Sequence, residues 1–251
     1  MKTTSIMKTT SILMWFCLLS FSVFSQENSA SIGKQSYIAV SVGSSIPLLD
    51  FKSTDGNNDY AGFAKSGTKY DILWGKDLKN PQWGITNLFR LHTNPVDNGA
   101  LASIAKTANP TFDYTITAED WKLYTLMGGA YYRIPITKKM TIMPKAMVGL
   151  AYIYSPEINV VAINNAGNSA TFSPVFFTEA SNSVTPSFLF SIGLKSNLYK
   201  RIVLVSNFDI LGAFPTFNDV NTTYGNGTSI NRTRSPNLLT FNYGFGIGYK
   251  F

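Results

Sequence analysis

The sequence has little charge, a single cysteine, a single histidine and no long apolar run. Charged residues make up 14% of the 251 residues, about half of the quarter that is usual in soluble domains. With one cysteine, Cys17, no disulfide framework can form. The longest apolar run falls short of the roughly 20 residues that a spanning helix needs. After Gln26, no segment shows a convincing 3.6-residue apolar period. These absences argue against a disulfide-rich scaffold and against a helical bundle.

Residues 1–25 have the composition of a secretory signal peptide. Two lysines precede the apolar run ILMWFCLLSFSVF, and a small residue stands at the expected cleavage point. A basic start, a short apolar core and a small residue at the cut are typical of such a signal. MKTTSI occurs twice at the start, so Met1 and Met7 are both candidate initiators. We expect export through a cleaved signal peptide, with residues 26–251 as one mature domain.

The pattern that recurs is alternation of apolar residues with small or polar ones. In the last fourteen residues, LLTFNYGFGIGYKF, every second residue counted back from the end is large and apolar. A period of two is typical of a β-strand with one apolar face. Eight segments show this alternation: residues 37–46, 68–76, 83–92, 121–134, 141–154, 187–198, 202–210 and 238–251.

The connections between these segments alternate in length. Three are tight and basic (DLKNPQ, PITKKM and NLYKR), and four are long and rich in Asn, Gly, Ser, Thr and Pro. An even number of strands of about ten residues, with short turns at one end and long loops at the other, is typical of a transmembrane β-barrel. A sheet can span hydrocarbon only when it closes on itself. The sequence therefore predicts an all-β fold, an eight-stranded antiparallel up-and-down transmembrane β-barrel. Together with export, this makes residues 26–251 one outer-membrane β-barrel domain.

The expected outer faces suit a wall in contact with lipid. They carry no charge in mid-strand, where a charge would cost about 2–4 kcal/mol. A strand of a soluble sandwich is the alternative, but a sandwich rarely exposes such an apolar edge because it invites aggregation. Aromatic residues near the strand ends are expected to form girdles at the membrane interfaces. They are Trp74, Trp83, Trp121, Tyr132, Tyr152, Tyr154 and Tyr249.

The segment VSVGSSIPLLDFKSTDGNNDYAGFAKSGTKYDI carries a second kind of signal. Gly43, Pro47 and Phe51 are followed by AGFA at 61–64 and by Gly67. This pattern resembles the start of a family of outer-membrane β-barrel proteins common in Bacteroidota, broadly similar to the small OmpA-, OmpX- and OmpW-type barrels. The resemblance implies an outer-membrane location with outer-membrane lipids as partners. It carries no activity that could be assigned to residues.

The C-terminal alternation also resembles the signal by which bacterial outer-membrane barrels are inserted. The residues that carry this resemblance are Phe251, Tyr249, Ile247 and Phe245. It implies the barrel-insertion machinery as a further partner.

Charged or titratable side chains fall on the expected inward faces. They are Lys69, Asp71, Arg90, His92, Arg133, Lys145, Lys195, Asp209 and Lys250. They either form a hydrogen-bonded filling that holds the barrel together or line a basic path for anions. The filling is favoured, since an eight-stranded barrel has room only for side chains. No Ser-His motif lies near His92 in the sequence, so we expect no catalytic site.

No motif in the sequence indicates a cofactor, a metal or a nucleic-acid partner. Asp50, Asp55 and Asp59 depart from the regular spacing of calcium ligands. Part of the +7 net charge lies in the short turns, where it solvates the turns rather than forming a stripe for nucleic acid. The apolar segment TFSPVFFTE at 171–179 has two interpretations. It is a binding surface or hydrophobic-ligand gate, or it is a hairpin that continues two strands beyond the membrane.

The expected function is non-enzymatic. We expect a structural role in the envelope or loop-mediated binding of an unknown extracellular ligand. The first alternative is porin-like passive transport of small or hydrophobic solutes. The second is a lipid-modifying outer-membrane enzyme, for which the sequence offers only one histidine.

Overall fold

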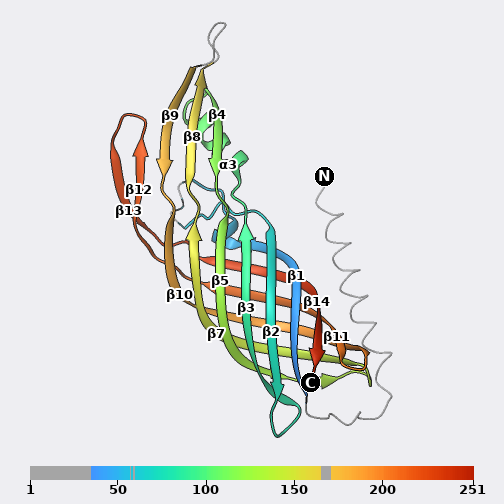
Figure 1. Ribbon diagram of the computed structural model, residues 1–251. Coiled ribbons are helices and arrows are strands. Elements are labelled where there is room, and N and C mark those ends of the chain that lie inside the picture. The colour runs from blue at the N-terminus through green and yellow to red at the C-terminus, as the bar shows by residue number, and fades with distance from the viewer. Residues whose placement is uncertain (1–34, 57, 59, 165–170) are drawn as a thin grey trace, which may run out of the picture.

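The computed structural model describes residues 35–56, 58, 60–164 and 171–251, so the expected signal peptide lies outside the described residues. The described chain forms two β-sheets and two helices (Figure 1). In chain order the elements are β1 (Ser36–Leu48), α2 (Leu49–Lys52), β2 (Gly67–Asp77), β3 (Trp83–Asn94), α3 (Asn98–Ala108), β4 (Asp113–Ala118), β5 (Trp121–Tyr132), β6 (Ile134–Pro135), β7 (Met140–Ser155), β8 (Ile158–Asn164), β9 (Thr171–Thr178), β10 (Ser181–Tyr199), β11 (Ile202–Ala213), β12 (Phe217–Tyr224), β13 (Ser229–Arg234) and β14 (Leu238–Lys250).

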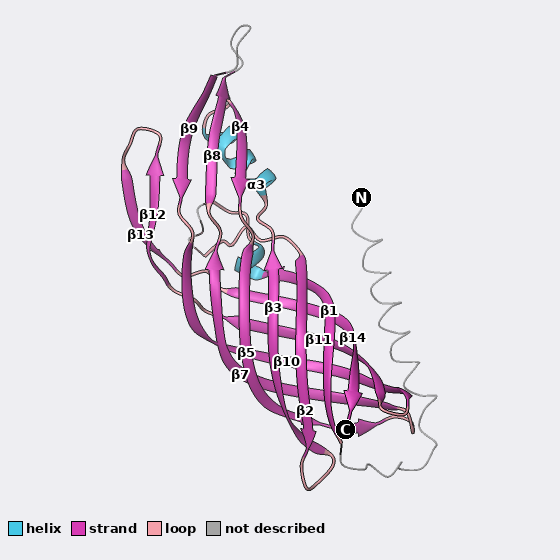
Figure 2. Cartoon of the chain, in the orientation of Figure 1, coloured by secondary structure: helices cyan, strands magenta, loops and turns pink. Residues whose placement is uncertain are grey.

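Eight of these strands close into an antiparallel barrel (Figure 2). The order around the wall is β1-β2-β3-β5-β7-β10-β11-β14, and β14 pairs with β1 to close the ring. Consecutive barrel strands are neighbours throughout, which is the up-and-down arrangement. The predicted eight-stranded antiparallel barrel is confirmed.

The register of the strands sets the width of the barrel. Following paired residues once around the wall from Ile153 leads through His92 and Gly244 and returns to β7 at Met143, ten residues away. A stagger of this size in an eight-stranded barrel corresponds to strands tilted by about 35–45° and an interior that side chains can fill. The lumen is therefore narrow because of the register itself.

Alternation along each strand decides which side chains meet lipid. On β14, Phe245, Ile247 and Tyr249 point outward and are exposed, whereas Asn242 and Gly244 point inward and are buried. Each of the other seven barrel strands also carries large apolar residues that are exposed on the outer wall. This belt matches the faces predicted from the sequence, and it is the surface that a bilayer would cover.

Aromatic side chains lie at both ends of the belt. Near the short turns, Trp83 packs edge-on against Tyr132 with ring centroids 5.0 Å apart. Near the long loops, Tyr152 and Tyr154 pack at 4.9 Å. The prediction that Trp121 belongs to a girdle is wrong. Trp121 is only 5% exposed, because its place in the alternation of β5 puts it on the inward face.

The long loops fold into a second sheet beyond the barrel. Its strand order is β13-β12-β9-β8-β4, and Figure 1 shows it projecting from the long-loop end. β8 and β9 pair with each other between β7 and β10, so the segment at 171–179 forms the hairpin that one interpretation predicted.

Helix α3 packs beside β4 at this same end of the molecule. Its N-cap, Asp97, accepts a hydrogen bond from the backbone N–H of Ala100 at 3.0 Å, which is a typical helix start. This helix was not predicted from the sequence. Within the described residues, neither helix has the length and hydropathy needed to cross a bilayer.

Candidate functional site: a filled lumen beneath an apolar cavity

The centre of the barrel interior is occupied by a buried ion-pair network. Arg90 on β3 donates from Nε and Nη2 to the two carboxylate oxygens of Asp71 on β2, at 2.7 and 3.0 Å. It also donates from Nη1 and Nη2 to both oxygens of Asp209 on β11, at 2.6 and 2.9 Å. One guanidinium therefore binds two carboxylates in bidentate fashion, the strongest geometry available to such a pair.

Further side chains extend the network, among them Ser41, whose Oγ donates to Asp71 Oδ2 at 3.3 Å. Lys69 Nζ lies 2.9 Å from Asp71 and 3.3 Å from Asp209, and Asn242 Nδ2 donates to Asp209 at 2.9 Å. Lys69, Arg90, Asp71 and Asp209 together contribute two positive and two negative charges, all essentially inaccessible to solvent. Buried charges are stable only when they are paired and hydrogen-bonded, and this set meets that condition.

The remaining inward-facing basic residues lie toward the short-turn end. Arg133 forms a salt bridge with Asp77, which also accepts a hydrogen bond from the Tyr131 hydroxyl at 2.6 Å. The lysines each bind an amide oxygen. Their contacts are Lys145 Nζ with Asn207 Oδ1 at 2.6 Å, Lys195 Nζ with Gln35 Oε1 at 3.2 Å, and Lys250 Nζ with Asn197 Oδ1 at 2.8 Å.

Apolar side chains fill the interior around these polar groups. A cluster of buried residues packs around the network and between it and the short-turn end of the barrel. It includes Leu88, Met127, Met147 and Leu189. The cavity between this cluster and the network measures about 10 Å³, which is close to the minimum that a single water needs. The described interior is therefore packed with side chains at mid-height.

His92 is the next inward-facing residue after Arg90 on β3 and is fully buried. Within the described chain, neither of its ring nitrogens has a hydrogen-bond partner. The hydroxyls of Thr125 and Ser187, also inward-facing, lack partners among the described residues too. A catalytic Ser-His pair needs a direct hydrogen bond between nucleophile and base, and His92 makes none with a serine among the described residues.

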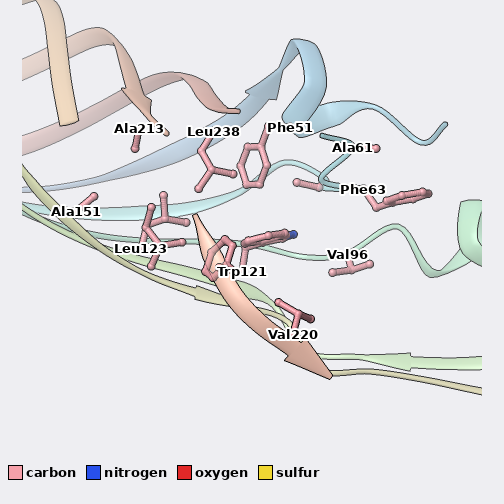
Figure 3. Packing of buried hydrophobic residues seen from close by; sticks show 13 residues of the cluster. Phe51, Ala61, Phe63, Val96, Trp121, Leu123, Ala151, Ala213, Val220 and Leu238 are labelled. Carbon is pink, nitrogen blue, oxygen red and sulfur yellow. The ribbon is translucent and has the colours of Figure 1, made fainter. Parts of the chain in front are cut away.

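A second apolar cluster occupies the mouth of the barrel at the long-loop end (Figure 3). The Trp121 ring packs against Phe51 at 5.5 Å and against Phe217 at 6.0 Å. Its Nε1–H donates to the backbone carbonyl of Gly62 at 2.9 Å. The loop that follows β1 is thus held inside the mouth by both packing and a hydrogen bond.

Phe51 and the AGFA residues at 61–64, which carry the resemblance to outer-membrane barrels, lie in this mouth. Phe51 is completely buried, and Gly62 lies directly against it. A Cβ on Gly62 would come within 2.5 Å of the Phe51 ring and 2.6 Å of its carbonyl oxygen. Glycine is therefore required at position 62 by close approach, which is a physical reason for the AGFA pattern.

An apolar cavity of about 240 Å³ lies beyond the mouth cluster, among the loops. Its wall combines the first loop, α3, the end of β7 and the second sheet. The lining residues are Gly56, Ala61, Gly62, Phe63, Leu101, Ile104, Trp121, Ser155, Pro156, Ile158, Phe176, Thr178, Phe217, Val220, Arg234 and Pro236. Apart from Arg234, every one of them is uncharged. The only signal for this site in the sequence was the apolar segment at 171–179, which supplies Phe176 and Thr178.

Asp50 in α2 makes structural contacts. Asp50 accepts hydrogen bonds from Asn237 Nδ2 at 2.8 Å and from Asn58 Nδ2 at 3.3 Å. Asp59 lies outside the described residues. In the described part of the chain, no group of three or more His, Cys, Asp or Glu side chains is placed to hold a metal ion.

The closed ring, the apolar belt and the filled interior define a small transmembrane β-barrel with an ordered loop domain at one end. No family model matches the sequence, and no curated protein does so.

Several solved structures are similar to this chain. The attachment invasion locus protein Ail of Yersinia pestis is 12% identical, covers 87% of this chain and 99% of its own, and has a TM-score of 0.44. A major outer membrane protein from Thermus thermophilus is 12% identical, with coverages of 86% and 99% and a TM-score of 0.48. The outer membrane protein OprG from Pseudomonas aeruginosa is 14% identical, with coverages of 89% and 99% and a TM-score of 0.37.

Proposed function

We propose that this chain is a non-enzymatic outer-membrane protein that binds an apolar ligand, or an apolar group of a larger ligand, at the cell surface. The observation that supports this proposal is the contrast between the two parts of the molecule. The lumen is filled by the Arg90 network and by apolar side chains. The long-loop end instead holds an apolar cavity of about 240 Å³.

The outer-membrane location rests on the barrel itself. In bacterial outer-membrane barrels, short turns face the periplasm and long loops face the outside, and the second sheet would then be extracellular. Cleavage of residues 1–25 and insertion through the pattern at Phe245, Ile247, Tyr249 and Phe251 belong to the same proposal. We expect Phe251→Ala to lower the amount of assembled barrel in the membrane, with Phe172→Ala on β9 as the control. Equal amounts of assembled barrel for the two variants would contradict a role of Phe251 in insertion.

The chemistry of the cavity indicates what it binds. A cavity of about 150 Å³ lined by aliphatic and aromatic residues already takes up benzene, so about 240 Å³ can hold a larger group. The walls offer Trp121, Phe176 and Phe217 for packing. Arg234 is the one charged lining residue, and its positive charge disfavours a cationic ligand.

Binding of N-phenyl-1-naphthylamine to the detergent-solubilised protein tests this site. Leu101→Trp on α3 fills the cavity, and we expect it to weaken probe binding at least tenfold. Ala108→Trp adds the same ring at the exposed end of the same helix and should leave binding unchanged. Equal binding by all three proteins would contradict the proposed site, provided that circular dichroism shows the same barrel in each.

Passive transport of small or hydrophobic solutes is a second candidate function, and one observation favours it. The cavity lies directly over the mouth of the barrel, because Trp121 and Phe217 belong both to its wall and to the mouth cluster. A solute moving inward would have to displace that cluster. Uptake of an alkane into proteoliposomes, faster with wild-type protein than with Leu101→Trp, would favour transport over binding alone.

A lipid-modifying activity is the least supported role, since the only histidine is buried without a hydrogen-bond partner in the described chain. Lipid A mass spectra from cells with wild-type protein and with His92→Ala test it. Identical spectra are expected.

A further inference from the structure

A groove runs along the lipid-facing wall close to the short turns. It measures about 360 Å³ and crosses β1, β14 and β11. Its lining residues are Ile38, Ala39, Val40, Ile202, Ile247, Gly248 and Tyr249. Its floor is the backbone of Ala39 and Gly248, which are paired there and which alternate onto the inward face, where they are buried. Ile38, Val40 and Ile247 rise on either side, so the groove is apolar along its length.

Two cationic residues lie where the groove meets the short-turn end. Arg201 precedes Ile202 and donates from Nη1 to the Tyr249 hydroxyl at 2.9 Å, with its guanidinium 6.0 Å from the centre of that ring. Lys200 is the neighbouring turn residue and is also exposed. Within the described chain neither cation forms a salt bridge. Tyr249 therefore links the apolar groove to Arg201, and Lys200, whose Nζ lies 5.2 Å from the centre of the Tyr199 ring, is the next cation in the same turn.

We propose that this groove binds one anionic phospholipid of the leaflet at the short-turn end of the barrel. An acyl chain lies between Ile38, Val40 and Ile247, and the phosphate contacts Arg201 and Lys200. The proposal goes beyond the apolar cavity and does not depend on what that cavity binds.

The physical reason for selectivity lies in the headgroup. Within a bilayer an apolar groove gains little by excluding water, since lipid tails already surround it, so it contributes packing alone. Basic residues at the membrane surface attract anionic lipids, and a guanidinium matches the geometry of a phosphate. The groove therefore fixes the position of the acyl chain, and the two cations provide selectivity for an anionic headgroup.

Native mass spectrometry of the whole protein in detergent, with phosphatidylglycerol or phosphatidylcholine added, tests the headgroup contact. We expect wild-type protein to retain one phosphatidylglycerol in preference to phosphatidylcholine. Arg201→Gln should weaken retention about fivefold, the factor expected for one basic residue at the surface. The double variant Lys200→Gln/Arg201→Gln should weaken it further. Lys138→Gln/Lys139→Gln removes the same charge from another short turn and should have no effect.

A second pair of variants tests the groove. Val40→Trp places an indole in the groove, whereas Val42→Trp places one on the same face of the same strand outside it. We expect only Val40→Trp to reduce phosphatidylglycerol retention. The proposal would be overturned if the two double variants lost phosphatidylglycerol equally and Val40→Trp and Val42→Trp also did so. Equal retention of the two lipids by wild-type protein would overturn it as well. Displacement of the lipid by millimolar glycerol 3-phosphate would also overturn it, because the site would then bind a soluble phosphate.

Discussion

Arg90 and Asp209 meet at 2.6 Å in the middle of the barrel although their strands lie on opposite walls. β3 and β11 are four steps apart around the ring in either direction. No backbone ladder joins them, so the contact between these two side chains connects the walls directly. The same guanidinium also binds Asp71 on β2. The polar filling therefore acts as a cross-brace between strands that are distant in the sequence and in the sheet.

Removing Arg90 should destabilise the barrel strongly. Arg90→Ala leaves Asp71 and Asp209 buried with too little positive charge around them, and breaking a buried pair in this way costs about 3–5 kcal/mol. The free energy of unfolding in urea, measured in detergent micelles, checks this. Lys106→Ala removes an ion pair with Asp113 that is more than half exposed, and it should change little because exposed pairs contribute little. Equal stability of Arg90→Ala and wild type would refute the cross-brace.

The mouth of the barrel should depend on the indole of Trp121. Trp121→Phe keeps an aromatic ring but leaves the Gly62 carbonyl without its donor, at a cost of about 1–3 kcal/mol. We expect lower stability and faster tryptic cleavage at Lys52 and Lys65, which flank the loop. Trp83→Phe on the outer wall is the matched control and should cleave at the wild-type rate. A loop equally resistant in both variants would show that the hydrogen bond does not hold it.

The outer wall should tolerate charge only at its ends. Val148 lies in the middle of β7 and is exposed, so Val148→Arg should cost about 2–4 kcal/mol in a bilayer. Val184 pairs with Tyr152 at the level of the aromatic girdle, where the same change should cost about 0–1 kcal/mol. Refolding titrations into phosphocholine vesicles compare the two. Similar costs would mean that the two positions do not differ in membrane depth.

Much of the barrel was predictable because alternation and turn length are local features of a sequence. The eight segments, their apolar faces and the short turns follow from a period of two and from a few basic residues. Trp121 shows that nearness to a strand end does not by itself predict which face of the strand a residue occupies. Its place near a strand end suggested an interfacial ring. However, Trp121 is two residues from the buried Leu123, so both side chains lie on the same inward face of the strand.

The loop domain was not predictable in the same way. β4, β12 and β13 are short strands of six to eight residues, and only β12 contains buried residues, so they give little core-facing signal in the sequence. Helix α3 has no buried residue, so no strongly buried face marked it in the sequence. The cavity joins residues from four separate loops, and only tertiary packing brings them together. The network around Arg90 is an intermediate case, since its members were predicted to face inward but their pairing depends on the register.

Conductance of the purified protein in planar bilayers tests the central claim most directly. A lumen packed by Arg90, Asp71 and Asp209 together with apolar side chains should give no steady current steps, in wild type and in Lys145→Ala alike. Steady, anion-selective openings that disappear in Lys145→Ala would show a basic path through the barrel and would contradict a filled lumen.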